Sequence, residues 1–120
     1  MKIAITTSGN DLNGQLDSRF GRAPKFLIYD LEANTFEVVD NEQNLNAAQG
    51  AGIQSAQTIA RLGVKALLTG HCGPKAFRVL AAAGIKIYNT SAATVAEALD
   101  QYRAATLTEA TSADVEGHWA

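Results

Sequence analysis

The chain has one cysteine among its 120 residues. A single cysteine excludes an intramolecular disulfide and a metal site made only of thiolates from one chain, so a metal would need other ligands, a second subunit or inorganic sulfide that it brings with it. No stretch approaches the roughly 20 apolar residues of a transmembrane helix, so we expect no membrane partner. Positive charge is not in excess either, because the formal net charge is −2, which argues against nucleic acid as a partner.

The length and composition fit a single domain with an ordinary core, since 47% of the residues are hydrophobic. The first residues enter a strand-like segment at once, with no signal-peptide pattern, so we expect a cytoplasmic protein. Thr, Ser and Ala dominate residues 106–113, which predicts a domain over 1–104 followed by a flexible tail over 105–120. His118 and Trp119 at its end could instead fold over a site or dock on a partner.

Hydrophobic periodicity predicts alternating strands and helices. Strand-like segments run over residues 2–7, 25–31, 35–40, 64–69 and 85–88, and helical spacing of apolar residues marks 48–62, 74–84 and 94–104. Gly63 and Gly84 stand where a glycine ends a helix, and Thr94 with Glu97 forms a capping box. Two successive helix–glycine–strand units indicate parallel crossovers.

This order of elements predicts an α/β fold with three layers, α/β/α, around a five-stranded mixed sheet. A strand order of 3-2-1-4-5, with strand 2 antiparallel, satisfies the right-handed crossover rule. The carboxyl ends of strands 1 and 4 then lie side by side, at the edge where open α/β sheets bind ligands. The loops that follow these strands, 8–24 and 70–73, are therefore expected to face each other. The first is far longer than a usual connection, which indicates function or disorder.

The loop after strand 4 contains the side chains with the most distinctive chemistry, an imidazole and a thiol. Gly70 and Gly73 bracket His71 and Cys72, and Pro74 opens the next helix. Free N–H groups at a helix start attract anions, whereas thiolate and imidazole select soft or borderline metals. The same residues could therefore hold an anionic metal cluster or a phosphate. A buried cysteine at a strand end is also often only a small hydrophobic residue, and that interpretation of Cys72 stays open.

Two other segments are candidates for the same site. The long loop begins at Ser8 and carries a basic cluster around Phe20, namely Arg19, Arg22 and Lys25. Gly50 and Gly52 lie where the first long helix begins, so that backbone could approach a ligand closely. The simpler interpretations are a solvated loop with Phe20 in the core and a flexible entry to the helix.

The sequence gives little support to an enzyme. A metal-dependent nuclease on this strand order would need carboxylates on strands 1 and 4, and neither strand contains an acid. A nucleophilic Cys72 would need a nearby base, but neighbouring side chains such as that of His71 usually point apart. We therefore expect no catalytic residues, and a thiol redox sensor is the least supported alternative.

Several segments carry a resemblance to a known family. They are Gly50-Ala51-Gly52-Ile53-Gln54-Ser55-Ala56 with Gly63-Val64, then Gly70-His71-Cys72-Gly73-Pro74-Lys75-Ala76, then Ala83-Gly84-Ile85-Lys86-Ile87-Tyr88. Residues 1–104 thereby resemble the dinitrogenase iron-molybdenum cofactor-binding family of the NifX and NifB C-terminal type. The segments Ser18-Arg19-Phe20-Gly21-Arg22-Ala23 and Val115-Glu116-Gly117-His118-Trp119 most resemble its small stand-alone members, including the orange proteins, which carry a molybdenum–copper–sulfide cluster.

The resemblance implies a ribonuclease H-like fold and a role in binding or carrying metal–sulfur clusters, with donor or acceptor proteins as partners. A molybdenum–copper–sulfide or iron–molybdenum–sulfur cluster is anionic and brings its own sulfide, so the protein need supply only cations, N–H groups and one or two soft ligands. Arg19 and Arg22 could supply charge, Gly73 an N–H group, Cys72 or His71 a metal ligand, and Phe20 shielding from water. The alternative is a phosphate- or nucleotide-binding regulatory module without metal.

Overall fold

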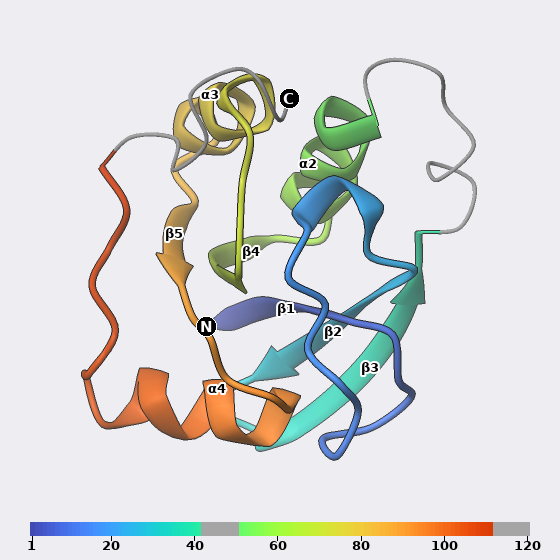
Figure 1. The fold of residues 1–120 in the computed structure, drawn as a ribbon, viewed down its shortest axis with the longest axis vertical. Coiled ribbons are helices and arrows are strands. Elements are labelled where there is room, and N and C mark those ends of the chain that lie inside the picture. Colours follow the sequence, from blue (N-terminus) through green and yellow to red (C-terminus); the bar gives the residue numbers. More distant parts are fainter. Residues whose placement is uncertain (42–50, 112–120) are drawn as a thin grey trace.

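The structure, a computed structural model, describes residues 1–41 and 51–111 (Figure 1). In chain order the elements are β1 (Lys2–Thr7), the 3-10 helix η1 (Phe20–Arg22), β2 (Lys25–Asp30), β3 (Thr35–Asp40), α2 (Ala51–Arg61), β4 (Val64–Thr69), α3 (Pro74–Ala82), β5 (Lys86–Asn89) and α4 (Val95–Arg103). The predicted elements are confirmed to within one or two residues, except that residues 48–50 of the first predicted helix lie outside the described residues. Within the described part of the chain, no helix is both long enough and apolar enough to cross a membrane.

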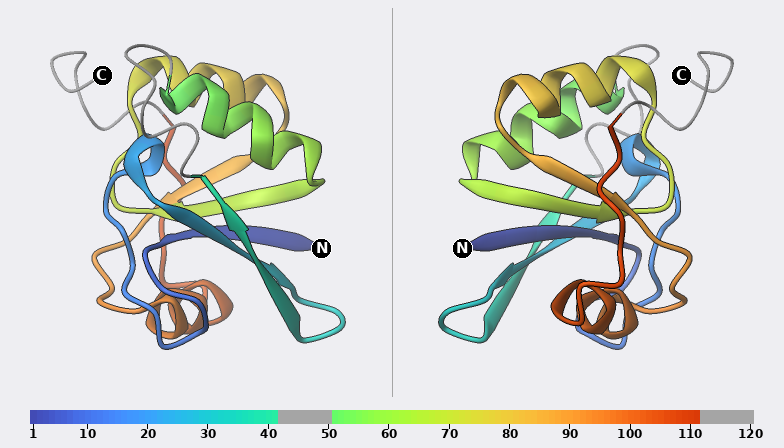
Figure 2. Two further views of the ribbon diagram at one scale, coloured as in Figure 1. Left: turned by 90° about the vertical axis from the view of Figure 1, so that its right-hand side faces the viewer. Right: turned by 90° about the vertical axis from the view of Figure 1, so that its left-hand side faces the viewer.

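The five strands form one sheet in the order β3-β2-β1-β4-β5. Strand β2 is antiparallel to both β1 and β3, whereas β4 is parallel to β1 and β5. Helices α2 and α3 cover one face of the sheet and α4 covers the other (Figure 2). The predicted three-layer fold, its strand order and its antiparallel second strand are therefore confirmed.

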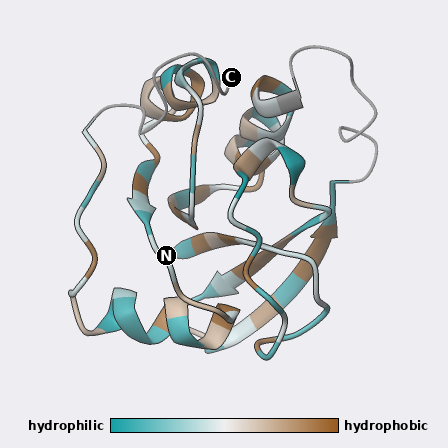
Figure 3. Ribbon diagram, viewed as in Figure 1, coloured by the Kyte–Doolittle hydropathy of each residue, from teal (hydrophilic) through white to brown (hydrophobic). Residues whose placement is uncertain are grey.

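The central strand explains why both faces must be covered. Ala4 of β1 belongs to the apolar cluster beneath α2 and α3, whereas its neighbours Ile3 and Ile5 belong to the cluster beneath α4, and all three are fully buried. Side chains alternate across a strand, so a continuous apolar run needs an apolar layer on each side. The helices supply these layers with one face each, and Figure 3 shows that they also carry hydrophilic residues.

The glycines and the capping box predicted at the helix ends adopt the expected conformations. Gly63 and Gly84 both have φ of +78°, a conformation that glycine adopts without steric cost. The hydroxyl of Thr94 accepts the N–H of Glu97 at 3.2 Å, and Oε2 of Glu97 accepts the N–H of Ala93 at 3.1 Å. The first bond satisfies an N–H group of the first turn of α4 that has no intrahelical acceptor, and the second ties the residue before the N-cap to the same turn.

The long loop between β1 and β2 divides into two ordered halves. Its first half packs at the start of α4, where Leu12 O accepts the N–H of Ala96 at 2.8 Å and Gly14 O accepts the N–H of Val95 at 3.0 Å. Leu12 and Leu16 also pack against the apolar cluster beneath α4. The second half contains η1, which packs against α2 (Figure 1). Only the second half therefore lies next to the loop that follows β4.

The segment that follows α4 runs beside the edge strand β5 (Figures 1 and 2). The N–H of Ala110 donates to Ile87 O at 2.7 Å, and Glu109 forms an isolated antiparallel bridge with Tyr88. Glu109 and Ala110 lie within the predicted tail, and the boundary at residue 104 with a flexible tail over 105–120 stays a prediction. The rest of the tail, with His118 and Trp119, lies outside the described residues, so the predicted flap stays a prediction.

Candidate functional site

The loops after β1 and β4 meet at the carboxyl ends of these adjacent strands, as the strand order predicts. The N–H of Phe20 donates to His71 O at 3.1 Å, and Arg19 forms an isolated parallel bridge with His71. The two groups of predicted site residues, within 19–22 and 71–74, therefore lie side by side. Their backbones are joined by hydrogen bonds, so side chains on them have a defined relative position.

Gly70 makes this close contact sterically feasible. A Cβ atom at this position would lie 2.7 Å from the carbonyl oxygen of Ser18 and 2.8 Å from its Cα. Two of the atoms that it would meet belong to the backbone, so no rotamer change could relieve the overlap. The close approach of the other loop thus explains the glycine before His71.

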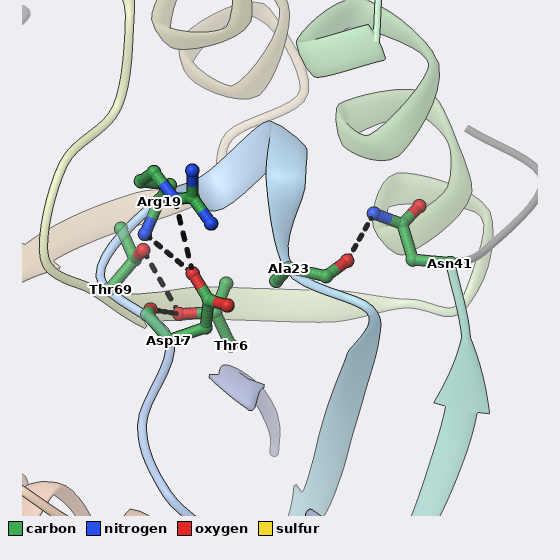
Figure 4. A network of polar contacts seen from close by, with 6 residues as sticks. All are labelled: Thr6, Asp17, Arg19, Ala23, Asn41 and Thr69. Atoms are coloured by element: carbon green, nitrogen blue, oxygen red, sulfur yellow. Dashed lines mark hydrogen bonds and ion pairs between the residues drawn. The ribbon is translucent and has the colours of Figure 1, made fainter. Parts of the chain in front are cut away.

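A buried network of hydroxyl groups lies beneath the joined loops (Figure 4). The Thr6 hydroxyl donates to Asp17 O at 2.6 Å and lies 3.0 Å from the hydroxyl of Thr69, and both threonines are fully buried. The N–H of Asp17 donates in turn to Thr6 O at 3.0 Å. These bonds connect the carboxyl ends of β1 and β4 to Asp17 and so hold the base of the loop.

Asp17 then contacts the first arginine of the basic cluster. Its Oδ1 accepts the backbone N–H of Arg19 at 2.9 Å and lies 3.9 Å from the guanidinium Nε. The Arg19 side chain is 63% exposed, whereas that of Asp17 is 15% exposed. Further along, the N–H of Arg22 donates to Arg19 O at 3.3 Å, so η1 brings the second arginine next to the first.

The predicted site residues differ in how far solvent reaches them. Arg19, Arg22 and His71 are exposed, Gly73 and Pro74 are half-buried, and Phe20 and Cys72 are buried. Phe20 stacks on Phe26 at 5.6 Å between ring centroids and belongs to the core beneath α2 and α3. Its ring therefore supports the loop from below. Cys72 belongs to the same cluster, with its Sγ 3.8 Å from Gly73 O.

The other predicted site residues lie away from the two joined loops or are not among the residues that the structure describes. Ser8 is exposed, and its N–H donates to Gln15 O at 3.2 Å, in the half of the loop that packs at α4. A Cβ at Gly52 would lie 3.2 Å from that of Ala76, so this glycine stands where α2 passes close to α3. Gly50 lies outside the described residues. Lys25 bonds through its Nζ to Asn10.

The donor set fits an anion better than a bare metal ion. Among residues 1–41 and 51–111, no group of three or more His, Cys, Asp and Glu side chains is arranged to hold a metal. Gly73 is the N-cap of α3 and places no side chain over the first-turn N–H groups, and Pro74 follows it. Such N–H groups have no intrahelical acceptor and attract anions, as do arginines. The surface therefore suits an anionic ligand.

Three residues that hold the base of the loop, Thr6, Asp17 and Thr69, were not among the predicted site residues. Asp17 and Arg19 form an Asp-x-Arg turn in which the carboxylate caps the N–H two residues on, and this local pattern is recognisable in a sequence. Thr6 and Thr69 gave no such signal, because their contact depends on the pairing of β1 with β4.

A hollow of about 520 Å³ lies elsewhere on the domain, and none of the predicted site residues line it. Its lining residues are Leu31, Tyr88, Tyr102, Arg103, Ala105 and Leu107.

Comparison with known proteins decides the family. The model of the dinitrogenase iron-molybdenum cofactor family matches residues 1–105. The chain belongs to this family. The resemblance predicted from the sequence is therefore confirmed, and membership supports a role in cofactor binding or cofactor biosynthesis.

Relatives and solved structures agree with this family assignment. The apo form of the orange protein from Desulfovibrio gigas is 39% identical, with a TM-score of 0.92 over 95% of this chain and 96% of that one. A candidate NifB protein from Thermotoga, of the DUF35 family, is 38% identical, with a TM-score of 0.85 over 97% and 98% of the two chains. An uncharacterized protein from Methanocaldococcus jannaschii is 33% identical over 82% of each chain.

Proposed function

We propose that this protein binds an anionic metal–sulfur cluster as cargo and carries or stores it for cofactor biosynthesis. The cluster would be of the molybdenum–copper–sulfide or iron–molybdenum–sulfur type. The observation that carries the proposal is the exposure of Arg19, Arg22 and His71 together on two hydrogen-bonded loops beside the start of α3. Family membership and the likeness to the apo orange protein support the same class of ligand.

Charge supplies the first part of the proposed attraction. Two guanidinium groups about 4 Å from a divalent anion in water contribute about 4 kcal/mol. That free energy alone corresponds to a dissociation constant of about 1 mM. N–H groups of α3 and one metal ligand would tighten binding beyond this value. An interaction of this kind is reversible, as a carrier requires when it exchanges cargo with donor and acceptor proteins, and it needs no catalytic group.

His71 is the better candidate for a direct metal ligand. Cys72 is 2% exposed and packs in the core, so its thiol would have to leave apolar surroundings to reach a cluster at the surface. His71 is exposed on the joined loops, and imidazole is a common ligand of copper and iron. We therefore propose one protein ligand at most, with Cys72 as a packing residue.

The test is anaerobic reconstitution of the full chain with tetrathiomolybdate and copper, followed by gel filtration, a visible spectrum and elemental analysis. We expect an intensely coloured protein with stoichiometric metal. The variant Arg19→Gln/Arg22→Gln should lose the colour, and Cys72→Ala should keep it. The matched control is Lys65→Gln/Lys86→Gln, which removes the same charge from exposed residues near the amino ends of β4 and β5 and should bind normally.

Two results would contradict the proposal. A colourless, metal-free protein would do so, and binding of inorganic phosphate in its place would favour the regulatory module. Equal loss of colour in the arginine and lysine variants would show that only the net charge of the protein matters.

A further inference from the structure

A carboxylate lies beside the arginine that the proposed cargo would use. Asp17 Oδ1 is 3.9 Å from the Nε of Arg19, and the two side chains lie together in Figure 4. We propose that Asp17 is a built-in counter-ion, which competes with an anionic cargo for Arg19 and so keeps the cargo releasable. This inference rests on the proposed function and adds a residue that sets its affinity.

The two partners differ in freedom to move. The backbone of Asp17 is held by hydrogen bonds in both directions with Thr6, whose hydroxyl contacts that of Thr69. Arg19 has a long side chain that is 63% exposed. An arriving anion can therefore draw the guanidinium outward, while the carboxylate stays at the base of the loop. When the anion leaves, the guanidinium returns to the same partner.

A purely structural role would not require a charge at this position. Asp17 Oδ1 caps the N–H of Arg19 at 2.9 Å, but asparagine and serine side chains supply an oxygen for such turns as well. The same loop contains a second cap of the same geometry, in which Asp11 Oδ1 accepts the N–H of Asn13 at 2.9 Å. Asp11 is exposed and, unlike Asp17, forms no ion pair with a described arginine.

The size of the effect follows from Coulomb's law. An anion that must separate two unit charges about 4 Å apart in water, as Asp17 and Arg19 are, binds roughly fivefold more weakly than it would without the carboxylate. High salt should abolish the difference, because the Debye length falls from about 10 Å at 0.1 M to about 3 Å at 1 M.

The experiment measures the dissociation constant of tetrathiomolybdate for the full chain by anaerobic absorption titration at low and high salt. Asp17→Asn keeps an acceptor for the Arg19 N–H and should bind about fivefold more tightly than the wild type at low salt. Asp11→Asn removes an equal charge from the same loop, keeps an acceptor for the Asn13 N–H and should bind like the wild type. In an Arg19→Gln background, Asp17→Asn should have a smaller effect. If Asp17→Asn unfolds, Asp17→Ser replaces it.

The outcomes separate the inference from the proposed function. Tighter binding by the Asp17 variant alone, dependent on Arg19 and abolished by salt, supports the counter-ion. Equal affinities of the wild type and the Asp17 variant, or equal gains in the Asp17 and Asp11 variants, overturn the counter-ion and leave the proposed function standing. If none of the folded proteins binds tetrathiomolybdate, the proposed function fails and the counter-ion fails with it.

Discussion

Replacement of Gly70 by alanine perturbs the joint between the two site loops. The added Cβ would lie 2.7 Å from Ser18 O and 2.8 Å from Ser18 Cα, whereas real Cβ atoms essentially never approach other atoms within 3.0 Å. The loops must therefore separate by a few tenths of an ångström. Overpacking of this kind costs about 1–3 kcal/mol, and the reduced entropy of the unfolded chain returns about 0.4–1 kcal/mol. We expect a net loss of about 1–2 kcal/mol.

Urea and thermal unfolding measure this loss, which corresponds to a fall of about 4–8 °C in Tm for a domain of this size. Hydrogen exchange of the Phe20 amide reports on the joint itself, since this N–H donates to His71 O across the two loops. Its exchange should accelerate more than that of strand amides, because the joint opens without unfolding of the sheet.

The control for this variant is Gly52→Ala. Its Cβ meets one side-chain atom, Ala76 Cβ at 3.2 Å, and alanine in a helix gains about 0.5–1 kcal/mol over glycine. Its stability should stay within about 0.5 kcal/mol of the wild type. The reasoning is refuted if Gly70→Ala matches the wild type in stability and in exchange of the Phe20 amide, because the loops would then not depend on their close approach.

Three further predictions concern stability away from the site. Ala105 has a φ of +58° at the end of α4, so Ala105→Gly should raise the free energy of unfolding by about 1 kcal/mol, and an unchanged Tm would show that the alanine is not strained there. Thr94→Ala removes the side-chain cap on Glu97 and should cost about 1 kcal/mol, measured by urea unfolding against Thr108→Ala as control. The N–H groups of Ala33 and Glu32 lower the pKa of Asp30, so its contribution to stability is present above the unfolded pKa of about 3.9 and is lost as pH falls through the lower folded pKa. Asp30→Asn should therefore flatten the acid side of the stability profile below about pH 4, and a profile parallel to the wild type would exclude this role.

The sequence alone was sufficient for the elements and their order. Apolar residues at period two or near 3.6, with glycines after the helices, are local properties that neighbouring residues impose on the backbone. The strand order followed because right-handed crossovers leave few arrangements for a hairpin followed by two helix–strand units. The same reasoning predicted that the loops after β1 and β4 face each other, as the contact of Phe20 with His71 confirms.

The tertiary structure decided which side chains that surface offers. Local sequence does not specify the direction in which a side chain points at the end of a strand, since this depends on distant residues that pack against it. Cys72 therefore looked as available as His71, although α2, α3 and Phe20 enclose its cluster. Thr6 holds Asp17 at the base of the loop, and the contact of Thr6 with Thr69 exists only because β1 pairs with β4. Periodicity determined the scaffold, and long-range packing decided which groups face an anionic ligand.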